Sequence, residues 1–348
     1  MYIFLLLLIF LIPSEGLTEG RGIAGRPDSH APISVMGDHN HKKGDLMFSY
    51  RYMRMEMSDL RDATHDISRT ETVSSSGSYK FMNTPIKMHT NMHMFGAMYG
   101  INNQLTAMLM APYIEKKMEV RQRAGDMQRF SVESRGLGDI KLTGLLSIKE
   151  EKNSKWLFNF GLSIPTGETN IKDVMVMMNG NHSHSTLGYG MQLGSGTYDP
   201  ILKLGYTKKW DNFSLGFQTS GVWRLYQNSN NYHLGDEYQG IFFSAFNISE
   251  WISLSGKIDG KWRRKISGAH KKHTNMLMSP AFSKDQGNRK INFGSGINFI
   301  IPKGKFKGNR FALEYLTPIY QYHDGLQMKS DGMLYFGWQY ALNLKDLF

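Results

Sequence analysis

One stretch near the C-terminus decides the fold class: Leu334-Tyr335-Phe336-Gly337-Trp338-Gln339-Tyr340-Ala341-Leu342-Asn343-Leu344. Large apolar side chains occupy every second position of this stretch, and most of the residues between them are smaller or polar. A period of two is typical of a β-strand with one apolar and one more polar face. At about ten residues, such a strand is long enough to cross a membrane at a tilt.

The same period recurs along the chain and predicts twelve strands. They are expected at 46–57, 87–99, 104–115, 138–149, 155–165, 200–210, 212–226, 238–248, 251–264, 289–301, 309–318 and 332–345. A closed barrel in the bacterial outer membrane needs an even number of strands if both ends of the chain are to lie on the same side. The prediction is therefore an all-β fold, a closed antiparallel transmembrane β-barrel of about 12 strands.

The predicted connections alternate in length, which favours a barrel over a soluble β-sandwich. Connections after even-numbered strands are short, as at 150–154, whereas those after odd-numbered strands are long, as at 166–199 and 265–288. Outer-membrane barrels combine short periplasmic turns with long outer loops. A sandwich is the alternative, since period-two strands also suit it, but its strands are usually about five or six residues long.

The N-terminus is typical of an exported protein. Residues 2–13 form an apolar run that has the length of a signal-peptide core and is too short to cross a bilayer as a helix. Ser14 and Gly16 offer small residues for cleavage, and an uncleaved anchor is the alternative. We therefore expect a signal peptide at 1–16, a flexible periplasmic lead-in containing Met and His at 17–45, and the outer-membrane barrel at 46–348.

Composition and charge exclude several classes of function. The 348 residues include no cysteine, which rules out thiolate metal sites and cysteine nucleophiles. The net charge of +11 is spread over pairs such as Lys42-Lys43 and Lys208-Lys209, without a basic arm or a nucleic-acid motif. We expect outer-membrane lipids and a small-molecule solute as partners, and no nucleic acid.

Charged residues on the predicted strands indicate a polar lumen. A charge is costly opposite lipid and ordinary inside a barrel, so we expect these residues to line the lumen: Arg51, Arg224, Lys257, Asp259 and Lys261. The sequence contains no Gly-x-Ser-x-Gly elbow, His-Glu-x-x-His helix or Walker loop. It therefore predicts passive movement of a small solute and no catalytic residue; a structural outer-membrane protein or a barrel enzyme is an alternative.

Methionine and histidine are abundant, with 23 and 12 copies. Thioethers favour Cu(I), and imidazole suits Cu(II), zinc and nickel. The candidate metal ligands lie in the lead-in and in two long loops: His30, Met36, His39, His41, His182, His184, His270 and His273. In strand 87–99 the period sends His89 and His93 to one face and Met92 and Met94 to the other, so the wall is no candidate. We favour the interpretation that Met serves here as an adaptable apolar residue, and binding of copper or zinc is the alternative hypothesis.

Several motifs resemble one known family. The chain resembles the outer-membrane transporters grouped with the MetA-pathway phenol-degradation proteins in three stretches: Gly161-Leu162-Ser163-Ile164-Pro165-Thr166-Gly167, Gln192-Leu193-Gly194-Ser195-Gly196-Thr197 and Gly337-Trp338-Gln339-Tyr340. A narrower Met- and His-rich subgroup is similar in Val35-Met36-Gly37-Asp38-His39 and in Ser49-Tyr50-Arg51-Tyr52-Met53-Arg54-Met55. The resemblance runs from about Ala31 to the end. It implies an outer-membrane barrel that transports small solutes, hydrophobic or aromatic compounds among them.

Overall fold

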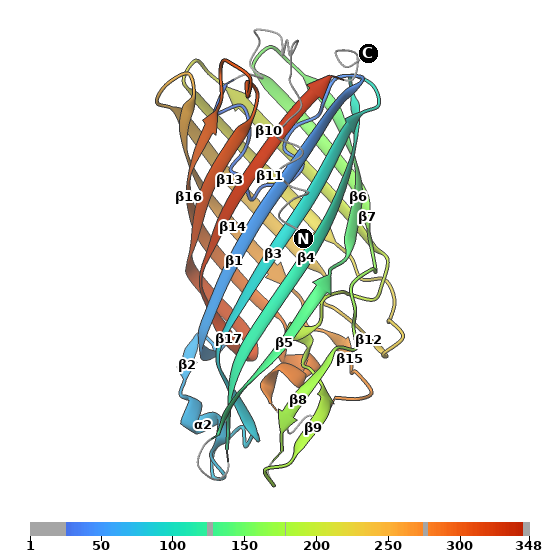
Figure 1. The fold of residues 1–348 in the computed structure, drawn as a ribbon, viewed down its shortest axis with the longest axis vertical. Coiled ribbons are helices and arrows are strands. Elements are labelled where there is room, and N and C mark those ends of the chain that lie inside the picture. The colour runs from blue at the N-terminus through green and yellow to red at the C-terminus, as the bar shows by residue number, and fades with distance from the viewer. Residues whose placement is uncertain (1–25, 124–127, 178, 274–277, 344–348) are drawn as a thin grey trace.

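The computed structural model describes residues 26–123, 128–177, 179–273 and 278–343 and forms a closed antiparallel β-barrel (Figure 1). Its wall contains β1 (Asp45–Ala63), β3 (Asn83–Gly100), β4 (Leu105–Gln122), β6 (Ile140–Glu150), β7 (Ser154–Ile164), β10 (Asp199–Lys209), β11 (Phe213–Val222), β13 (Glu237–Asn247), β14 (Ile252–Arg263), β16 (Asn288–Ile300) and β17 (Arg310–Asn343). Pairing between β17 and β1 closes the ring. The all-β barrel that the sequence predicts is thereby confirmed, and the sandwich alternative is wrong.

The last element, β17, crosses the wall twice. Its first part pairs with β16 and its second part with β1. The side chains of Arg310 and Gln339 are hydrogen-bonded, although a straight strand would hold them roughly 100 Å apart. The chain reverses near Gly325, whose φ of +136° suits glycine. The long connection expected at 319–331 is therefore wrong, because these residues extend the two strands to a tight turn.

A closed ring with only antiparallel neighbours needs an even number of passes. Each neighbouring pair in the ring is antiparallel. Among the described residues eleven elements form the ring, and the folded-back β17 supplies the additional pass. The number of passes thus agrees with the expectation of about twelve strands.

The two ends of the barrel differ in the length of their connections (Figure 1). One end has short segments at 101–104, 151–153, 210–212, 248–251 and 301–309. The other end carries most of the remaining elements: β2 (His65–Ile67), α2 (Arg69–Val73), β5 (Arg129–Leu137), β8 (Lys172–Val176), β9 (His182–Thr186), η3 (Tyr189–Met191), β12 (Tyr232–His233), β15 (Ser267–Gly268), η4 (Ser279–Ala281) and η5 (Ser283–Asp285). In the described residues, no helix is long and apolar enough to span a membrane.

Large apolar side chains cover the outside of the wall. Phe242 on β13 and Phe293 on β16 are 51% and 49% exposed, and similar residues lie on most of the other strands. The polar side chains that alternate with them face inward, as do the buried Lys257 and Asp259. This inverted arrangement suits an outer-membrane barrel, whose outer surface meets lipid.

The facing of β13 gives a first testable prediction. Phe242→Lys should destabilise the barrel by about 2–4 kcal/mol, because it places a charge against lipid near the middle of the wall. Gln239→Lys, three residues away, should change the stability by less than about 1 kcal/mol, since its side chain lies in the lumen beside Asp259. Urea unfolding in lipid vesicles measures both values, and equal losses would show that the facing is wrong.

The described part of the expected lead-in, residues 26–44, lies inside the barrel, and we term it the plug. Ala31, Ile33 and Val35 are buried there. The wall holds the plug by hydrogen bonds, among them Arg51 Nε to the Ile33 carbonyl (3.0 Å) and Asn159 Nδ2 to the Gly37 carbonyl (2.8 Å). These residues therefore lie in the lumen and not in the periplasm, and the flexibility expected of the segment stays a prediction. The signal peptide expected at 1–16 lies outside the described residues.

Candidate functional site

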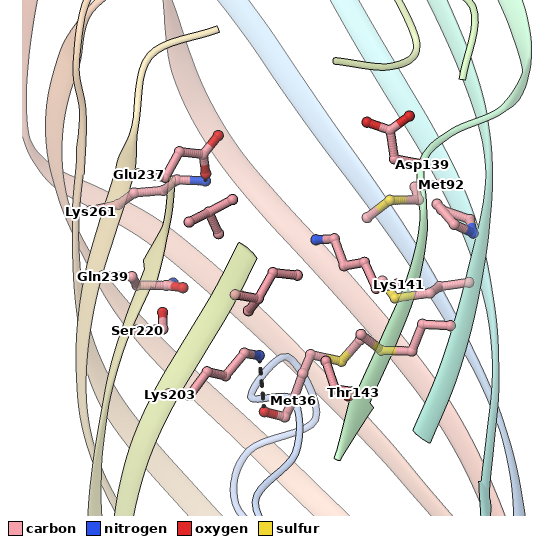
Figure 2. A pocket seen from close by; sticks show the side chains of 15 residues that line it. Met36, Met92, Asp139, Lys141, Thr143, Lys203, Ser220, Glu237, Gln239 and Lys261 are labelled. Atoms are coloured by element: carbon pink, nitrogen blue, oxygen red, sulfur yellow. Dashed lines mark hydrogen bonds and ion pairs between the residues drawn. The ribbon is translucent and has the colours of Figure 1, made fainter. Parts of the chain in front are cut away.

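A cavity of about 220 Å³ lies in the lumen beside the plug. Met36 of the plug forms part of its lining, and Figure 2 shows side chains from several strands pointing into the same space. Ile201, Val222 and Glu237 place the cavity at the ends of β10, β11 and β13 that carry the long connections. The plug enters from the opposite end, because Asp45 begins β1 beside the short turns. The cavity is thus located between the plug and the long connections.

One side of the cavity is apolar and rich in thioethers. Its lining includes Met92 and Met94 of β3 and Met110 of β4, next to Met36 of the plug. The period of β3 explains this facing, and it turns His93 to the other face, where its Nδ1 lies 2.8 Å from the hydroxyl of Tyr50. The predicted separation of Met92 and Met94 from His93 is confirmed.

Charged side chains complete the lining, with more cations than anions. Lys203, Lys261 and Glu237 lie across the cavity from Met92, whereas Lys141 and Asp139 lie on the same side as Met92, and Lys141 is paired with Met110 on the neighbouring strand. The partners of four of these are known: Lys203 Nζ donates to the Met36 carbonyl (3.3 Å), Lys261 pairs with Glu237, and the carboxylate of Asp139 accepts the backbone N–H groups of Gly167 and Ser195. Lys141 forms no ion pair with any described residue within 4.0 Å. Among the described residues, Lys141 is therefore the lysine of this lining without an ion pair or side-chain hydrogen bond.

All five charged residues predicted to line the lumen lie on the inner side of the barrel or at its rim, but only Lys261 borders the cavity. Arg51 binds the plug, and Arg224, just beyond β11, pairs with Asp199. Lys257 lies 3.1 Å from Glu314, and Asp259 accepts a hydrogen bond from Gln239. A role in solute contact stays a prediction for these five residues.

The sequence reasoning missed the group that joins the plug to the wall, which we term the latch: Ser34, Lys257, Arg310 and Glu314. Lys257 Nζ contacts Ser34 Oγ, and Glu314 Oε2 accepts the Ser34 backbone N–H at 2.9 Å. Arg310 Nη2 donates to the Ala31 carbonyl at 3.0 Å. Glu314 and Arg310 both lie on the inner face of β17, and this repeat of charged residues could have been noticed in the sequence. Nothing in the sequence, however, identifies their partners in the plug; Glu314 and Ser34 are 280 residues apart.

The candidate metal ligands fall into three separate places. His30, His39 and His41 lie together in the plug, where Asp38 joins them. The Met36 side chain packs instead in the cluster that contains Met94 and Met110, and its role as a metal ligand stays a prediction. His182 and His184 are exposed on β9. His270 and His273 stack on each other in the connection after β15, with ring centroids 4.5 Å apart.

Burial controls the protonation of the plug histidines. It lowers the pKa of His41 to about 3, and the pKa of His30 well below its usual value. Burial opposes ionisation of Asp38, yet the adjacent His39 imidazole holds the pKa of this carboxyl below its usual range. At neutral pH the plug therefore contains neutral imidazoles at His30 and His41 beside a carboxylate.

The sequence matches the model of one protein family over residues 81–315, and this family is described as "Putative MetA-pathway of phenol degradation". The chain belongs to this family. The resemblance seen in the sequence motifs is thereby confirmed. None of the curated proteins compared with the sequence matches it.

Among solved structures, an outer-membrane channel from Pseudomonas putida F1 has a similar fold. It shares 14% sequence identity, covers 88% of this chain and 99% of its own, and superimposes with a TM-score of 0.58. The toluene transporter TbuX of Ralstonia pickettii is more distant, with 9% identity, 92% and 98% coverage and a TM-score of 0.44. A deletion mutant of the monoaromatic hydrocarbon channel TodX gives 10% identity, 94% and 99% coverage and a TM-score of 0.47.

Proposed function

We propose that this protein is a passive outer-membrane channel for small organic solutes with an apolar or aromatic body, and that it favours their anionic forms. The observation that carries the proposal is the cavity in the lumen, where thioether and lysine side chains line the same space. Thioether side chains such as Met92 and Met94 suit an aromatic ring. Lys141, the cross-strand neighbour of Met110, offers a cation to the phenolate or carboxylate group of such a ring. The description of the family, which names phenol degradation, agrees with this class of solute.

The cavity dimensions support a small solute rather than a peptide or a sugar chain. A volume of about 220 Å³ accommodates one aromatic ring with a polar substituent. Three lysines against two carboxylates give the lining a positive balance, which attracts anions in a low-dielectric lumen. We assign no catalytic residue and no enzymatic activity to the chain.

The plug sets the resting state of the proposed channel. It lies between the cavity and the short turns, which outer-membrane barrels direct to the periplasm. A solute that enters through the long connections therefore reaches the cavity before it reaches the plug. Passage across the membrane requires the plug to move, and the latch residues oppose this movement.

Flux into vesicles tests the proposal. Benzenesulfonate should enter vesicles containing the protein several-fold faster than benzyltrimethylammonium, since both are aromatic and permanently charged but of opposite sign. Lys141→Met should lower benzenesulfonate flux several-fold, because it removes the free cation and nearly conserves side-chain length. Lys208→Met is the matched control, as Lys208 lies outside the cavity over Trp210. Equal flux of the two ions, or no flux above that of empty vesicles, would contradict the proposal.

A further inference from the structure

Three side chains of the plug converge on one point. His30 Nδ1 and His39 Nδ1 are 3.2 Å apart, Asp38 Oδ1 lies 2.8 Å from His39 Nδ1, and Asp38 Oδ2 lies 3.7 Å from His30 Nδ1. Within the described part of the chain, this is the group of His, Asp and Glu residues whose ligand atoms all lie within 4.8 Å of one another. Their side chains are mostly shielded, at 7–19% exposure.

Hydrogen bonding alone leaves this group unsatisfied. A neutral imidazole nitrogen carries either one proton or one lone pair. If His39 Nδ1 donates its one proton to Asp38, no second proton is left for a separate hydrogen bond to His30 Nδ1. If His39 Nδ1 is the acceptor for His30, two lone pairs face each other at 2.8 Å between His39 and the carboxylate. The buried Nε2 atoms of His39 and His41 also lack a hydrogen-bond partner.

A cation at the shared point would satisfy all three side chains. In a tetrahedral zinc site, metal–ligand bonds of about 2.0–2.2 Å place neighbouring ligand atoms about 3.3–3.6 Å apart. The two imidazole nitrogens in the plug are 3.2 Å apart, close to that value, and the two Asp38 oxygens lie on either side of it, Oδ1 at 2.8 Å from His39 Nδ1 and Oδ2 at 3.7 Å from His30 Nδ1. Two imidazole nitrogens and a carboxylate form a donor set typical of zinc and other divalent transition metals.

The surroundings hold these ligands in place. Asp38 Oδ2 accepts the backbone N–H of Ala31 at 2.8 Å, which orients the carboxylate toward the two imidazoles. Arg310 lies nearby, but its guanidinium is engaged with the Ala31 carbonyl, Asn298 and Gln339. The His41 ring centroid is 5.0 Å from that of His39, so a fourth position is open to water or to this ring.

We propose that His30, Asp38 and His39 bind a divalent transition-metal ion of the zinc class inside the plug. The ion would connect residue 30 to residues 38 and 39 and so hold the plug in its folded form within the lumen. The set differs from the one expected from the sequence, since Asp38 replaces Met36, and this substitution of oxygen for thioether favours zinc over Cu(I).

Zinc content of the purified protein tests the site. The full-length chain, produced without a histidine tag, is stripped with a chelator and dialysed against zinc, and bound metal is then measured by mass spectrometry. We expect one zinc ion per folded chain. Asp38→Asn, which retains an acceptor for the Ala31 N–H, and His30→Gln should each weaken zinc binding at least tenfold. Cobalt in place of zinc should give the visible spectrum of a tetrahedral site in the unmodified protein.

The control removes the other histidine pair. His182→Gln with His184→Gln, on the exposed β9, should leave zinc binding unchanged. Altered gel mobility on heating shows whether each variant is folded, so a loss of binding through misfolding is recognised. Zinc binding that survives Asp38→Asn and His30→Gln in folded protein, zinc loss confined to the β9 variant, or the absence of stoichiometric zinc in the unmodified chain would each overturn the proposal.

Discussion

Lys257→Met is expected to destabilise the barrel by about 3–5 kcal/mol, because it leaves Glu314 buried without its counter-ion. The two side chains are 1% and 2% exposed, and their charged atoms are 3.1 Å apart. Methionine nearly matches lysine in length and volume, so the loss reports the charge rather than a cavity. Urea unfolding in lipid vesicles gives the free energy of unfolding for each variant.

The double variant separates the ion pair from the packing. Glu314→Gln keeps an oxygen for the Ser34 N–H and removes the charge. The double variant Lys257→Met with Glu314→Gln should therefore lose at least about 2 kcal/mol less stability than the sum of the losses of the two single variants. Lys208→Met, an exposed lysine on β10, serves as the control and should cost less than about 1 kcal/mol. A loss below about 1 kcal/mol for Lys257→Met, or strict additivity in the double variant, would show that the latch does not depend on this pair.

The wall of the barrel is predictable because its signal is local. A period of two in a strand such as 251–264 fixes which side chains meet lipid, and the structure places Lys257 and Asp259 on the inner face as expected. The same local reasoning is insufficient at β17. There a long connection was expected at 319–331, but these residues extend the two strands up to a tight turn. A turn at Gly325 needs only one residue that accepts a positive φ, so the sequence shows no longer break.

The plug was not predictable from the sequence, for a physical reason. Its residues have no strand or helix period, and they are ordered by contacts with residues that are far away in the chain, such as Ser34 with Glu314. Length and composition alone suggest a flexible segment in such a case. The Met and His content singled out His30 and His39, which lie together in the plug, whereas Asp38 carries no Met or His signal of its own.

The gating role of the plug can be tested directly, because the chain has no cysteine of its own. A Cβ atom on Gly337 would lie 3.6 Å from the Cβ atom of Ile33, which is within the range for a disulfide. Ile33→Cys with Gly337→Cys should therefore link the plug to β17 when oxidised and release it when reduced. Each single variant, treated with the same oxidant, controls for unrelated effects of oxidation.

The decisive measurement is benzenesulfonate flux into vesicles that contain this double variant, before and after reduction. If solute crosses only when the plug moves, the oxidised protein should pass benzenesulfonate at least about tenfold more slowly than the reduced protein, corresponding to about 1.4 kcal/mol or more. The reduced protein should pass it at least as fast as the unmodified chain. Equal flux through the oxidised and reduced forms, with the disulfide shown to be formed, would contradict a channel gated by residues 26–44.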